Sequence, residues 1–443
     1  MSGKYFLETY GCQMNYHDSE RLSGLLEAAG YERTTDELAA DVAIINTCSV
    51  RERAEEKLYT RLGEWREVTA ERGTPPIIAV TGCVAQQEGE GLLRRDSSID
   101  VILGTQSLKS LPRLVEQARQ RRTLQIDIAP HDDVSFPLGV ARHSDPVRAW
   151  VTIIEGCNEF CSFCVVPYTR GNERMRPVAD ILAEVQSAAE SGRVEVQLLG
   201  QIVNHYQAPD DPRCDFPTLL ERVSAVAGIS RVRFASPHPR HVTDRLMEVI
   251  RDTPHVCKHL HLPVQSGSNR ILKAMRRRYT RESYLEIAAR LRETVPGVAL
   301  STDMIVGFPG ESDTDFELTL DLVRHARYHS MYSFKYSPRP NTLASKRYAD
   351  DVPEAIKTER ILALQDLQRT IQGELFASMI DTRTEVLVDG VSRRREWEMT
   401  GRTSGNSVVN FPGEESLRGQ LIPVTITGHG PNSLRGILAG APC

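Results

Sequence analysis

VTIIEGCNEFCSFC, residues 151–164, joins an apolar run of strand length to three cysteines with C-x3-C-x2-C spacing. These cysteines are Cys157, Cys161 and Cys164. Three thiolates this close together can hold three irons of a cubane cluster, whereas such clusters normally take four protein ligands. No fourth cysteine lies nearby in the sequence, so one iron would remain open to a small molecule. A loop that directly follows a strand is also where a metal site is expected.

Two other uses of these cysteines fit the pattern less well. A structural zinc site usually draws four ligands from two pairs, and neither a second C-x2-C pair nor an H-x3-H pair follows. A disulfide framework is typical of short secreted chains with an even number of cysteines, whereas this chain has 443 residues and nine cysteines. The sequence therefore favours an iron–sulfur cluster.

The composition is ordinary for a globular protein of about two to four domains, with 40% hydrophobic and 26% charged residues. No run of apolar residues is long enough for a membrane span, and the N-terminus lacks the apolar region of a signal peptide. We therefore expect a cytoplasmic protein, where reduced cysteines bind metal more often than they pair. The net charge of −5 indicates no polyanion partner, so nucleic-acid binding would depend on local basic patches.

The first third of the chain repeats one unit, a short apolar run followed by a helical pattern. The runs span 4–10, 42–47, 77–82 and 100–104, and the helical patterns span 19–29, 51–67 and 86–95. This alternation predicts a parallel sheet, in which ligand sites lie beyond the carboxyl ends of the strands. Cys12, Cys48 and Cys83 all follow predicted strands, at nearly equal separations.

Cysteines from adjacent strand ends can meet at one edge of the sheet and hold a second cluster, again with an open iron. Helix N-termini would face that site and stabilise its negative charge. The alternative is that these cysteines are buried core residues, a common role for free cysteine. Their matching places in three successive units favour a ligand role. The remaining cysteines, Cys214, Cys257 and Cys443, fit neither cluster, and we expect them to be incidental.

Four motifs around the cysteines resemble those of the radical S-adenosylmethionine (SAM) methylthiotransferase family. They are YGCQMN at 10–15, NTCSVR at 46–51, TGC at 81–83 and CVVPYTRG at 164–171. Within the family they are most similar to the enzymes that modify N6-dimethylallyladenosine in tRNA, and the resemblance covers nearly the whole chain. Ile202 and Asn341 depart from the family pattern, where asparagine and glycine are usual.

The resemblance implies two [4Fe–4S] clusters with different tasks. The cluster held by Cys157, Cys161 and Cys164 would bind SAM at its open iron and cleave it to a 5′-deoxyadenosyl radical. An auxiliary cluster involved in sulfur donation would be held by Cys12, Cys48 and Cys83.

The middle of the chain predicts six further strand–helix units. Strand patterns lie at 149–155, 194–199, 231–235, 258–263, 299–306 and 331–336, and helical patterns at 178–190, 217–227, 242–251, 281–294 and 313–327. Periodicity predicts the βα architecture, and the resemblance implies an open (β/α)6 radical-SAM barrel. A long helix at 353–377 follows, and short β runs from about 380 predict a small antiparallel barrel. That barrel resembles a TRAM domain, an OB-like RNA-binding module.

We therefore expect an α/β protein of three domains. They are an N-terminal methylthiotransferase domain with the auxiliary cluster at 1–128, a radical SAM domain at 143–377 and a TRAM domain at 378–443. A polar, proline-containing linker at about 129–146 would join the first two.

Barrel enzymes build their sites at the carboxyl ends of the strands, and the resemblance places SAM there. Gly200 and Gln201 would approach the SAM amino group, and Ser236 and Gln265 its carboxylate or ribose. The backbone from Ile305 to Gly307 would pack on adenine. The cofactor-binding candidates are thus Phe163, the aromatic residue before the last cysteine, with Gly200, Gln201, Ser236, Gln265, Ile305 and Gly307. Each is alternatively an ordinary loop residue.

Three basic segments are candidates for tRNA contact, although charge runs are usually solvated surface. Arg170, Arg174 and Arg176 follow the cluster motif, and a second group lies at 270–278. Basic side chains at a cleft mouth would neutralise phosphates. In the C-terminal barrel, Arg394 and Arg402 would bind RNA if Arg393 and Arg395 share their face, with Trp397 or Phe411 for base stacking. That barrel is alternatively a purely structural cap.

The resemblance implies methylthiolation at C2 of N6-dimethylallyladenosine, at position 37 next to the anticodon of tRNA, with SAM as methyl donor and radical source. The partners would be that tRNA, an electron donor of flavodoxin or ferredoxin type, and a sulfur source; we expect a monomer with no membrane contact. One alternative is a sister methylthiotransferase acting on threonylcarbamoyladenosine in tRNA or on an aspartate of a ribosomal protein. Another is a non-catalytic RNA-binding iron–sulfur redox sensor.

Overall fold

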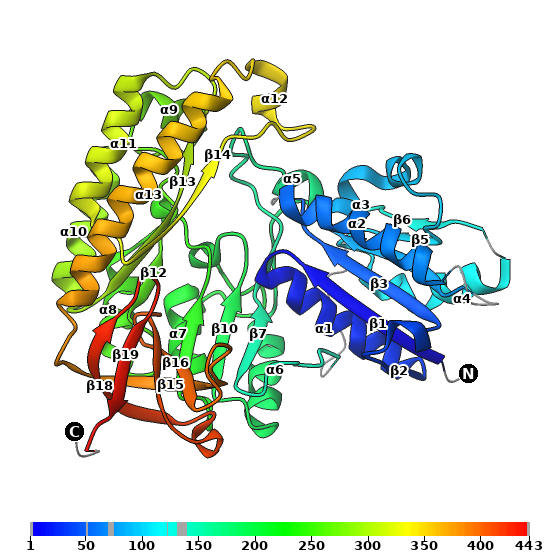
Figure 1. The fold of residues 1–443 in the computed structure, drawn as a ribbon, viewed down its shortest axis with the longest axis horizontal. Helices are drawn as coiled ribbons and strands as arrows, with labels where there is room; N and C mark the ends of the chain where they lie inside the picture. Colours follow the sequence, from blue (N-terminus) through cyan, green and yellow to red (C-terminus); the bar gives the residue numbers. More distant parts are fainter. Residues whose placement is uncertain (1–2, 50–51, 70–74, 122, 131–139, 441–443) are drawn as a thin grey trace. The chain divides into compact units, whose positions relative to one another are not determined.

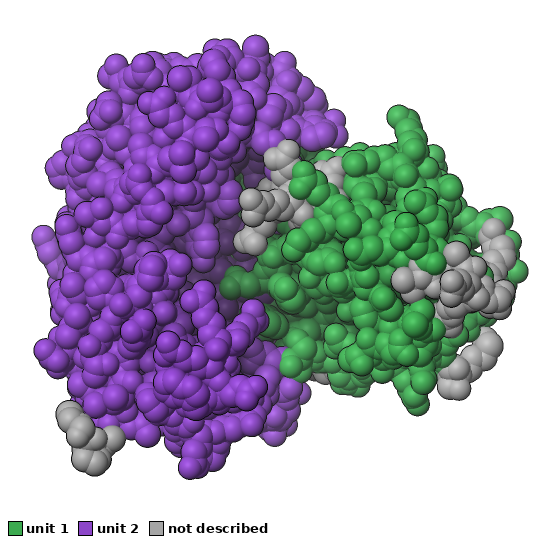
Figure 2. Space-filling model, in the orientation of Figure 1, with its two compact units in different colours: residues 1–144, 150–159, 165–176 green, residues 145–149, 160–164, 177–443 purple. Residues whose placement is uncertain are grey.

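The computed structural model describes residues 3–49, 52–69, 75–121, 123–130 and 140–440. Val50 and Arg51 of the second cysteine motif, residues 131–139 of the predicted linker and Cys443 lie outside these residues. The chain divides into two compact units (Figure 2). Unit 1 comprises residues 1–144, 150–159 and 165–176, and unit 2 comprises 145–149, 160–164 and 177–443.

Unit 1 is built on a six-stranded sheet in which every pairing is parallel. The strand order is β2-β1-β3-β4-β5-β6. The strands are β1 (Gly3–Tyr10), β2 (Tyr31–Arg33), β3 (Val42–Thr47), β4 (Ile77–Gly82), β5 (Val101–Leu103) and β6 (Gln125–Asp127). The sequence pattern predicts four of them. It misses β2 and β6, since three-residue strands carrying Glu32 or Gln125 and Asp127 have no apolar run.

Helices cover both faces of this sheet. α1 (Gln13–Ala28) and α4 (Leu111–Arg121) bury leucines against one face. α2 (Glu52–Thr69) and α3 (Cys83–Glu88) pack on the other, around Trp65. α1 begins at Gln13, six residues before the predicted start, because Cys12 is its N-cap and polar residues near its start are buried. The helix N-terminus therefore starts directly at a cysteine.

Unit 2 contains most of the open barrel, whose strands form two three-stranded sheets, β11-β10-β7 and β12-β13-β14. The pairings of β10 with β11, β12 with β13 and β13 with β14 are parallel, and the last three residues of β7 belong to unit 1. A parallel bridge from Val232 to Val256 links β11 to the segment before β12. The strands are β7 (Arg148–Thr152), β10 (Glu195–Leu199), β11 (Arg231–Phe234), β12 (His259–His261), β13 (Ala299–Val306) and β14 (Ser330–Lys335). The predicted α/β class and open six-unit barrel are confirmed.

Helices alternate with these strands as predicted. They are α6 (Val178–Glu190), α7 (Phe216–Ser224), α8 (Asp244–Asp252), α9 (Asn269–Ala274), α10 (Arg281–Thr294), α11 (Asp313–Ala326), α12 (Leu343–Arg347) and α13 (Glu354–Ala377). Figure 1 shows α10, α11 and α13 side by side on the outer face of β12–β14. Residues 154–175 add the short elements β8 (Ile154–Glu155), α5 (Val166–Thr169) and β9 (Arg174–Met175).

The C-terminal residues form a closed five-stranded barrel, in the order β15-β16-β17-β19-β18. Its strands are β15 (Arg383–Val391), β16 (Glu398–Thr403), β17 (Val408–Pro412), β18 (Leu421–His429) and β19 (Leu434–Leu438). The predicted small antiparallel barrel is confirmed, and within it β17 and β19 pair in parallel. Hairpin turns predict only pairings between consecutive strands, and this one joins strands that are not consecutive.

This small barrel docks on β11 and on the residue before β12. Arg233 donates from Nη2 to the carbonyl oxygen of Thr403 (2.7 Å), and the Lys258 backbone N–H donates to the Ser404 hydroxyl (2.8 Å). Arg231 donates to the carbonyl oxygen of Glu385 (3.1 Å). The small barrel therefore does not occupy the carboxyl ends of these strands, where barrel enzymes build their sites. Among the described residues, no helix is long and apolar enough to cross a membrane.

Candidate metal centres

The three cysteines of unit 1 come together at the carboxyl ends of neighbouring strands. Cys12 follows β1, Cys48 follows β3 and Cys83 follows β4. The register pairs Tyr10 with Thr47 and Thr47 with Gly82, so these strand ends lie in one row. The strand order reverses between β1 and β3, and open α/β sheets bind ligands at such a switch point. We call this group the first site.

The sulfurs of the first site are within hydrogen-bonding reach of one another. A hydrogen bond from Cys48 lowers the pKa of the Cys12 thiol to about 6, against the raising effect of burial. Cys48 likewise lowers the pKa of Cys83 to about 7, again against burial. The pKa of Cys48 itself is raised, because it donates to both neighbours and is buried. Three convergent sulfurs, two of them favoured as thiolates, fit a cluster that takes three protein ligands and leaves one iron open.

Buried amides hold the first site together. Asn15, in the first turn of α1, donates from Nδ2 to Asn46 Oδ1 at the end of β3 (3.1 Å). Asn46 donates in return to the Asn15 carbonyl oxygen (2.7 Å) and to the Ser19 hydroxyl (2.9 Å). Both amides are fully buried. This network fixes the helix that begins at Cys12 against the strand that ends before Cys48.

Two glycines make room where the strand ends converge. A Cβ on Gly11, whose φ is +134°, would lie 2.4 Å from the Cβ of Cys48. A Cβ on Gly82, with φ +94°, would lie 2.4 Å from Asn46 Oδ1. Neither the backbone conformation nor the space accepts a side chain. These glycines precede Cys12 and Cys83 directly, so the close approach of the cysteines depends on them.

Arg170 is the buried cation of the first site. Its Nη2 donates to Asp18 Oδ2 on α1 (2.6 Å), and its side chain is 4% exposed. The hydrogen bond from Cys48 is the largest cause that lowers the pKa of Cys12 and of Cys83, and burial opposes it. The positive charge of Arg170 lowers both pKa values further. The structure thus places Arg170 beside cysteine sulfurs inside unit 1, and not on an exposed surface for tRNA phosphates.

The second site is the C-x3-C-x2-C loop. Cys157 belongs to unit 1, where its backbone N–H donates to the Gly171 carbonyl oxygen (3.1 Å). Cys161 and Cys164 belong to unit 2, and the Cys164 N–H closes a turn on the Cys161 carbonyl oxygen (3.1 Å). The cysteines of this site are thus adjacent because they are neighbours in the chain.

Ser162 anchors the loop in unit 2 almost entirely through the backbone. Its N–H donates to the Met275 carbonyl oxygen (3.0 Å), and its own carbonyl oxygen accepts from the Ala344 N–H (2.7 Å). Its hydroxyl adds a bond to the Ala274 carbonyl oxygen (2.8 Å). The next residue, Phe163, packs against a buried apolar cluster that includes Ile271, Met275, Phe308, Tyr336 and Ala344. Cys161 and Cys164 therefore project from a firmly held turn.

The other predicted SAM contacts lie at strand ends of unit 2, in unusual backbone conformations. Ser236 follows β11 with φ +62°, Gln265 follows β12 with φ +74°, and Gly307 follows β13 with φ +69°. Such conformations in non-glycine residues persist where the surroundings impose them, often at functional sites. Gln265 is held by backbone hydrogen bonds to Asp303 and from Ile305, each 2.9 Å.

The rest of this strand-end set is consistent with a cofactor site. Gly200 is buried at the end of β10, and Gln201, which follows it, is half-buried. The Gly307 N–H donates to Glu311 Oε2 (2.7 Å), which fixes the turn after β13. Asn341, where glycine is usual in the family, has φ +68°, a conformation that asparagine tolerates better than most residues.

Sequence reasoning missed His238, which follows β11. Asn204 holds its backbone, donating to the His238 carbonyl oxygen (2.9 Å) and accepting from its N–H (2.8 Å). The His238 Nδ1 accepts the Arg240 N–H (3.2 Å), so a neutral ring carries its proton on Nε2. Burial and the charge of Arg277 lower the pKa of His238 to about 2. Its buried Nε2–H has no partner among the described residues, which leaves a donor for a ligand.

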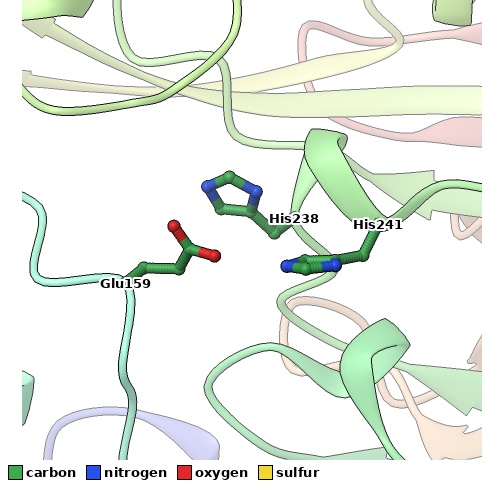
Figure 3. A group of neighbouring side chains, drawn as sticks. All are labelled: Glu159, His238 and His241. Atoms are coloured by element: carbon green, nitrogen blue, oxygen red, sulfur yellow. The ribbon is translucent and has the colours of Figure 1, made fainter.

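Figure 3 shows His238 together with His241, which ends the same short turn; Glu159, also drawn there, belongs to unit 1. His241 stacks on His205, which follows β10, with ring centroids 4.3 Å apart. The signal that could have found these histidines is their position, since all three lie in the loops that follow β10 and β11.

The predicted RNA-binding residues differ in how exposed they are. Arg174 and Arg176 are half-buried, Arg174 opposite Glu155 in the β8–β9 pair and Arg176 donating to the Thr152 carbonyl oxygen (3.3 Å). In the C-terminal barrel, Arg394 is exposed and Trp397 is 60% exposed. Arg402 is partly covered, and burial lowers its pKa, with Asp389 nearby (3.7 Å).

The prediction that Phe411 is available for base stacking is wrong. Phe411 is fully buried in the core of the small barrel, because alternate residues of β17 face inward. Trp397 remains as the exposed aromatic residue of the predicted pair. Arg395 lies over its ring, 5.4 Å from the centroid.

Family models match the chain in three successive parts. They are the Uncharacterized protein family UPF0004 over residues 4–104, the Radical SAM superfamily over 151–323 and the TRAM domain over 377–439. The first match contains all three cysteines of the first site, and the second contains the cysteine loop and the strand ends of the barrel.

Curated relatives match over nearly the full length of the chain. A tRNA-2-methylthio-N(6)-dimethylallyladenosine synthase of Alkalilimnicola ehrlichii is 43% identical, covering 99% of this chain and 98% of its own. Proteins of the same name from Methylococcus capsulatus (44%; 99% and 96%) and Thermoanaerobacter pseudethanolicus (45%; 96% and 90%) are similarly related.

Among solved structures, the radical SAM methyltransferase TsrM of Kitasatospora setae, with cobalamin and a [4Fe–4S] cluster bound, aligns with a TM-score of 0.60. It is 15% identical and covers 78% of this chain and 77% of its own. The cobalamin-dependent radical SAM enzyme OxsB aligns with a TM-score of 0.52 at 12% identity, covering 83% and 57%. At these identities the likeness shows the fold.

Proposed function

The chain belongs to the tRNA-2-methylthio-N(6)-dimethylallyladenosine synthase family, and from this membership we propose that it attaches a methylthio group to C2 of N6-dimethylallyladenosine in tRNA. The modified base would be at position 37, next to the anticodon, with SAM as methyl donor and radical source. The observation that carries this proposal is the near-complete match to relatives of that name. The convergence of Cys12, Cys48 and Cys83 at one sheet edge supports it.

Two [4Fe–4S] clusters and SAM, when bound, supply the radical and sulfur-transfer chemistry. The first site would hold the auxiliary cluster, and Cys157, Cys161 and Cys164 the other. The protein's own contribution is to fix these sulfurs in place and, at the first site, to lower the pKa of Cys12 and Cys83. Burial of Cys48 and Cys83 excludes water from the first site.

The strand ends of unit 2 would orient SAM. Ser236 and Gln265 present polar side chains from constrained backbones, and the turn after β13, fixed by Glu311, offers a close backbone approach at Gly307. The Nε2–H of His238 adds a neutral donor at the same end of the barrel, for a carboxylate or a base edge. No general base is assigned.

Contact with tRNA would involve the C-terminal barrel. The segment between β15 and β16 carries three exposed arginines, Arg393 to Arg395, next to Trp397. Arginine neutralises phosphates and an exposed indole stacks on an unpaired base. An electron donor of flavodoxin or ferredoxin type and a sulfur source would complete the reaction. A reducing cytoplasmic compartment suits the reduced cysteines, and we propose that the chain acts there as a monomer.

The test is nucleoside mass spectrometry of tRNA after anaerobic incubation with reconstituted protein, SAM and dithionite. Matched tRNAs with and without the prenyl group are compared. We expect a methylthio group on the prenylated adenosine alone. Turnover only on the unprenylated tRNA would overturn the substrate assignment and favour a sister enzyme. Absence of 5′-deoxyadenosine as well as product would favour a non-catalytic iron–sulfur protein.

A further inference from the structure

The run Arg276–Arg278, predicted from sequence to be part of a phosphate-binding patch, is split by the structure. Arg276 and Arg278 are exposed, whereas Arg277 between them is 6% exposed. Both flanking residues have positive φ, +58° and +55°. A non-glycine residue in this conformation is strained and persists only where the surroundings impose it. This turn therefore directs one arginine of the run inward.

The buried guanidinium of Arg277 is held at all three nitrogens. Its Nη1 donates to Cys161 Sγ (3.3 Å), its Nη2 to the Pro263 carbonyl oxygen (2.9 Å), and its Nε to the Tyr279 hydroxyl (2.8 Å). The Tyr279 hydroxyl in turn donates to the Val264 carbonyl oxygen (2.9 Å). The planar fork is thus fixed before any cofactor binds, with one N–H aimed at a sulfur of the second site.

The hydrogen-bond partners of Arg277 leave its buried positive charge without a carboxylate. No carboxylate of the described residues lies within ion-pair distance of Arg277, and its other partners are a carbonyl and a phenol. A buried cation without an anionic partner is unfavourable. When a cluster is bound, an iron-ligating sulfur at Cys161 would place negative charge next to the Arg277 Nη1, which lies 3.3 Å from that sulfur.

We propose that Arg277 is a positioning residue for the second site, and that its N–H···S bond to Cys161 raises the reduction potential of the cluster held there. Hydrogen bonds to cysteine sulfur and nearby positive charge stabilise the more negative, reduced state. Reduction adds one electron, from a low-potential donor or from dithionite, with no bond made or broken at Arg277. This inference rests on the cluster assignment of the proposed function.

The test is a redox titration of the anaerobically reconstituted full chain, followed by electron paramagnetic resonance of the signal that responds to SAM. Arg277→Gln removes the charge and keeps a polar side chain, and Arg276→Gln is the matched control from the same run. We expect Arg277→Gln to shift the midpoint to more negative potential and to lower 5′-deoxyadenosine formation several-fold with dithionite. Titanium(III) citrate, a stronger reductant, should restore much of that loss. Arg276→Gln should keep the wild-type midpoint.

An Arg277→Gln protein with full iron content and the wild-type midpoint would overturn the inference. If that variant does not assemble its cluster, Arg277→Lys decides, because lysine keeps the charge but not the fork. A midpoint more negative than wild type supports the proposal, and an unchanged midpoint overturns it. Wild-type protein without any SAM-responsive signal would instead count against the proposed function, before any variant is compared.

Discussion

At the first cysteine site three strands of one sheet each contribute a sulfur, whereas at the second site three cysteines lie within eight residues of chain. The first site is held by side chains, above all the buried amides Asn15 and Asn46. The second is anchored by backbone hydrogen bonds of Ser162. Each has a buried arginine, Arg170 or Arg277, associated with its sulfurs. Cluster binding at the first site, whose ligands come from three strands, should therefore depend on the side chains that hold those strands and α1 together. Cluster binding at the second site, whose ligands are neighbours in the chain, should depend mainly on the ligands themselves.

The largest expected effect comes from removing one ligand at each site. Cys48→Ala should lower the iron content from about eight to about four per chain, abolish methylthiolation and leave SAM cleavage intact. Cys161→Ala should lower iron similarly but abolish 5′-deoxyadenosine formation. Iron assay, product analysis and 5′-deoxyadenosine quantification check both variants. Full methylthiolation by Cys48→Ala would remove the first site from the reaction.

Scaffold substitutions sharpen the comparison. Asn46→Ala leaves the buried Asn15 side-chain N–H without its partner, which costs about 1–3 kcal/mol and loosens Cys12 relative to Cys48. We expect iron to be lost from the first site while SAM cleavage persists. The matched change, Ser162→Ala, removes one hydrogen bond to the Ala274 carbonyl oxygen, worth about 1 kcal/mol, and should leave both clusters loaded. Equal iron loss in the two variants would contradict the distinction between the sites.

Much of this arrangement follows from sequence. Apolar runs before Cys12, Cys48 and Cys83 are long enough to predict buried parallel strands, and strand ends of such sheets share an edge. The barrel units follow from the same alternation. Local sequence patterns predict these strands and helices because each element buries its own apolar residues.

The rest depends on contacts between residues far apart in the chain. Asn15 and Asn46 become partners only when β1 and β3 pair. Nothing in a run of three arginines distinguishes Arg277, since its burial comes from the backbone of the turn and from carbonyls after β12. The parallel closure of β17 on β19 is equally non-local. Charge patterns in sequence therefore overestimate surface patches wherever a cation has an internal partner.

Acid should affect the amino end of β10 in unit 2. Glu195, at the amino end of β10, is fully buried, and although burial raises its pKa, the guanidiniums of Arg233 and Arg148 lower it to about 2. A carboxyl with a lowered pKa stabilises the fold above its unfolded value, 4.5, and this contribution is lost as pH falls toward 2. Between pH 7 and pH 4 the loss is about 1 kcal/mol.

Denaturant unfolding at several pH values checks this expectation. In Glu195→Gln the residue no longer titrates, so the variant should be less stable at pH 7 and its stability should fall less between pH 7 and pH 4. An acid dependence identical to that of wild type would mean that other carboxyls control it. Loading of the second site at pH 7 should be retained where the variant folds, because Glu195 lies at the opposite end of the strands.

The smallest effect is expected where an arginine stays on the surface. Arg394 is exposed between β15 and β16, and unlike Arg170 or Arg277 it is not buried beside a sulfur. Arg394→Ala should weaken tRNA binding a few-fold and reduce the slope of log affinity against log salt by about 1. Arg383→Ala, an exposed arginine at the other end of β15, is the control and should leave the slope unchanged. Fluorescence anisotropy with labelled tRNA over a salt series measures both. If the two variants behave alike, exposure alone does not identify the RNA-binding face.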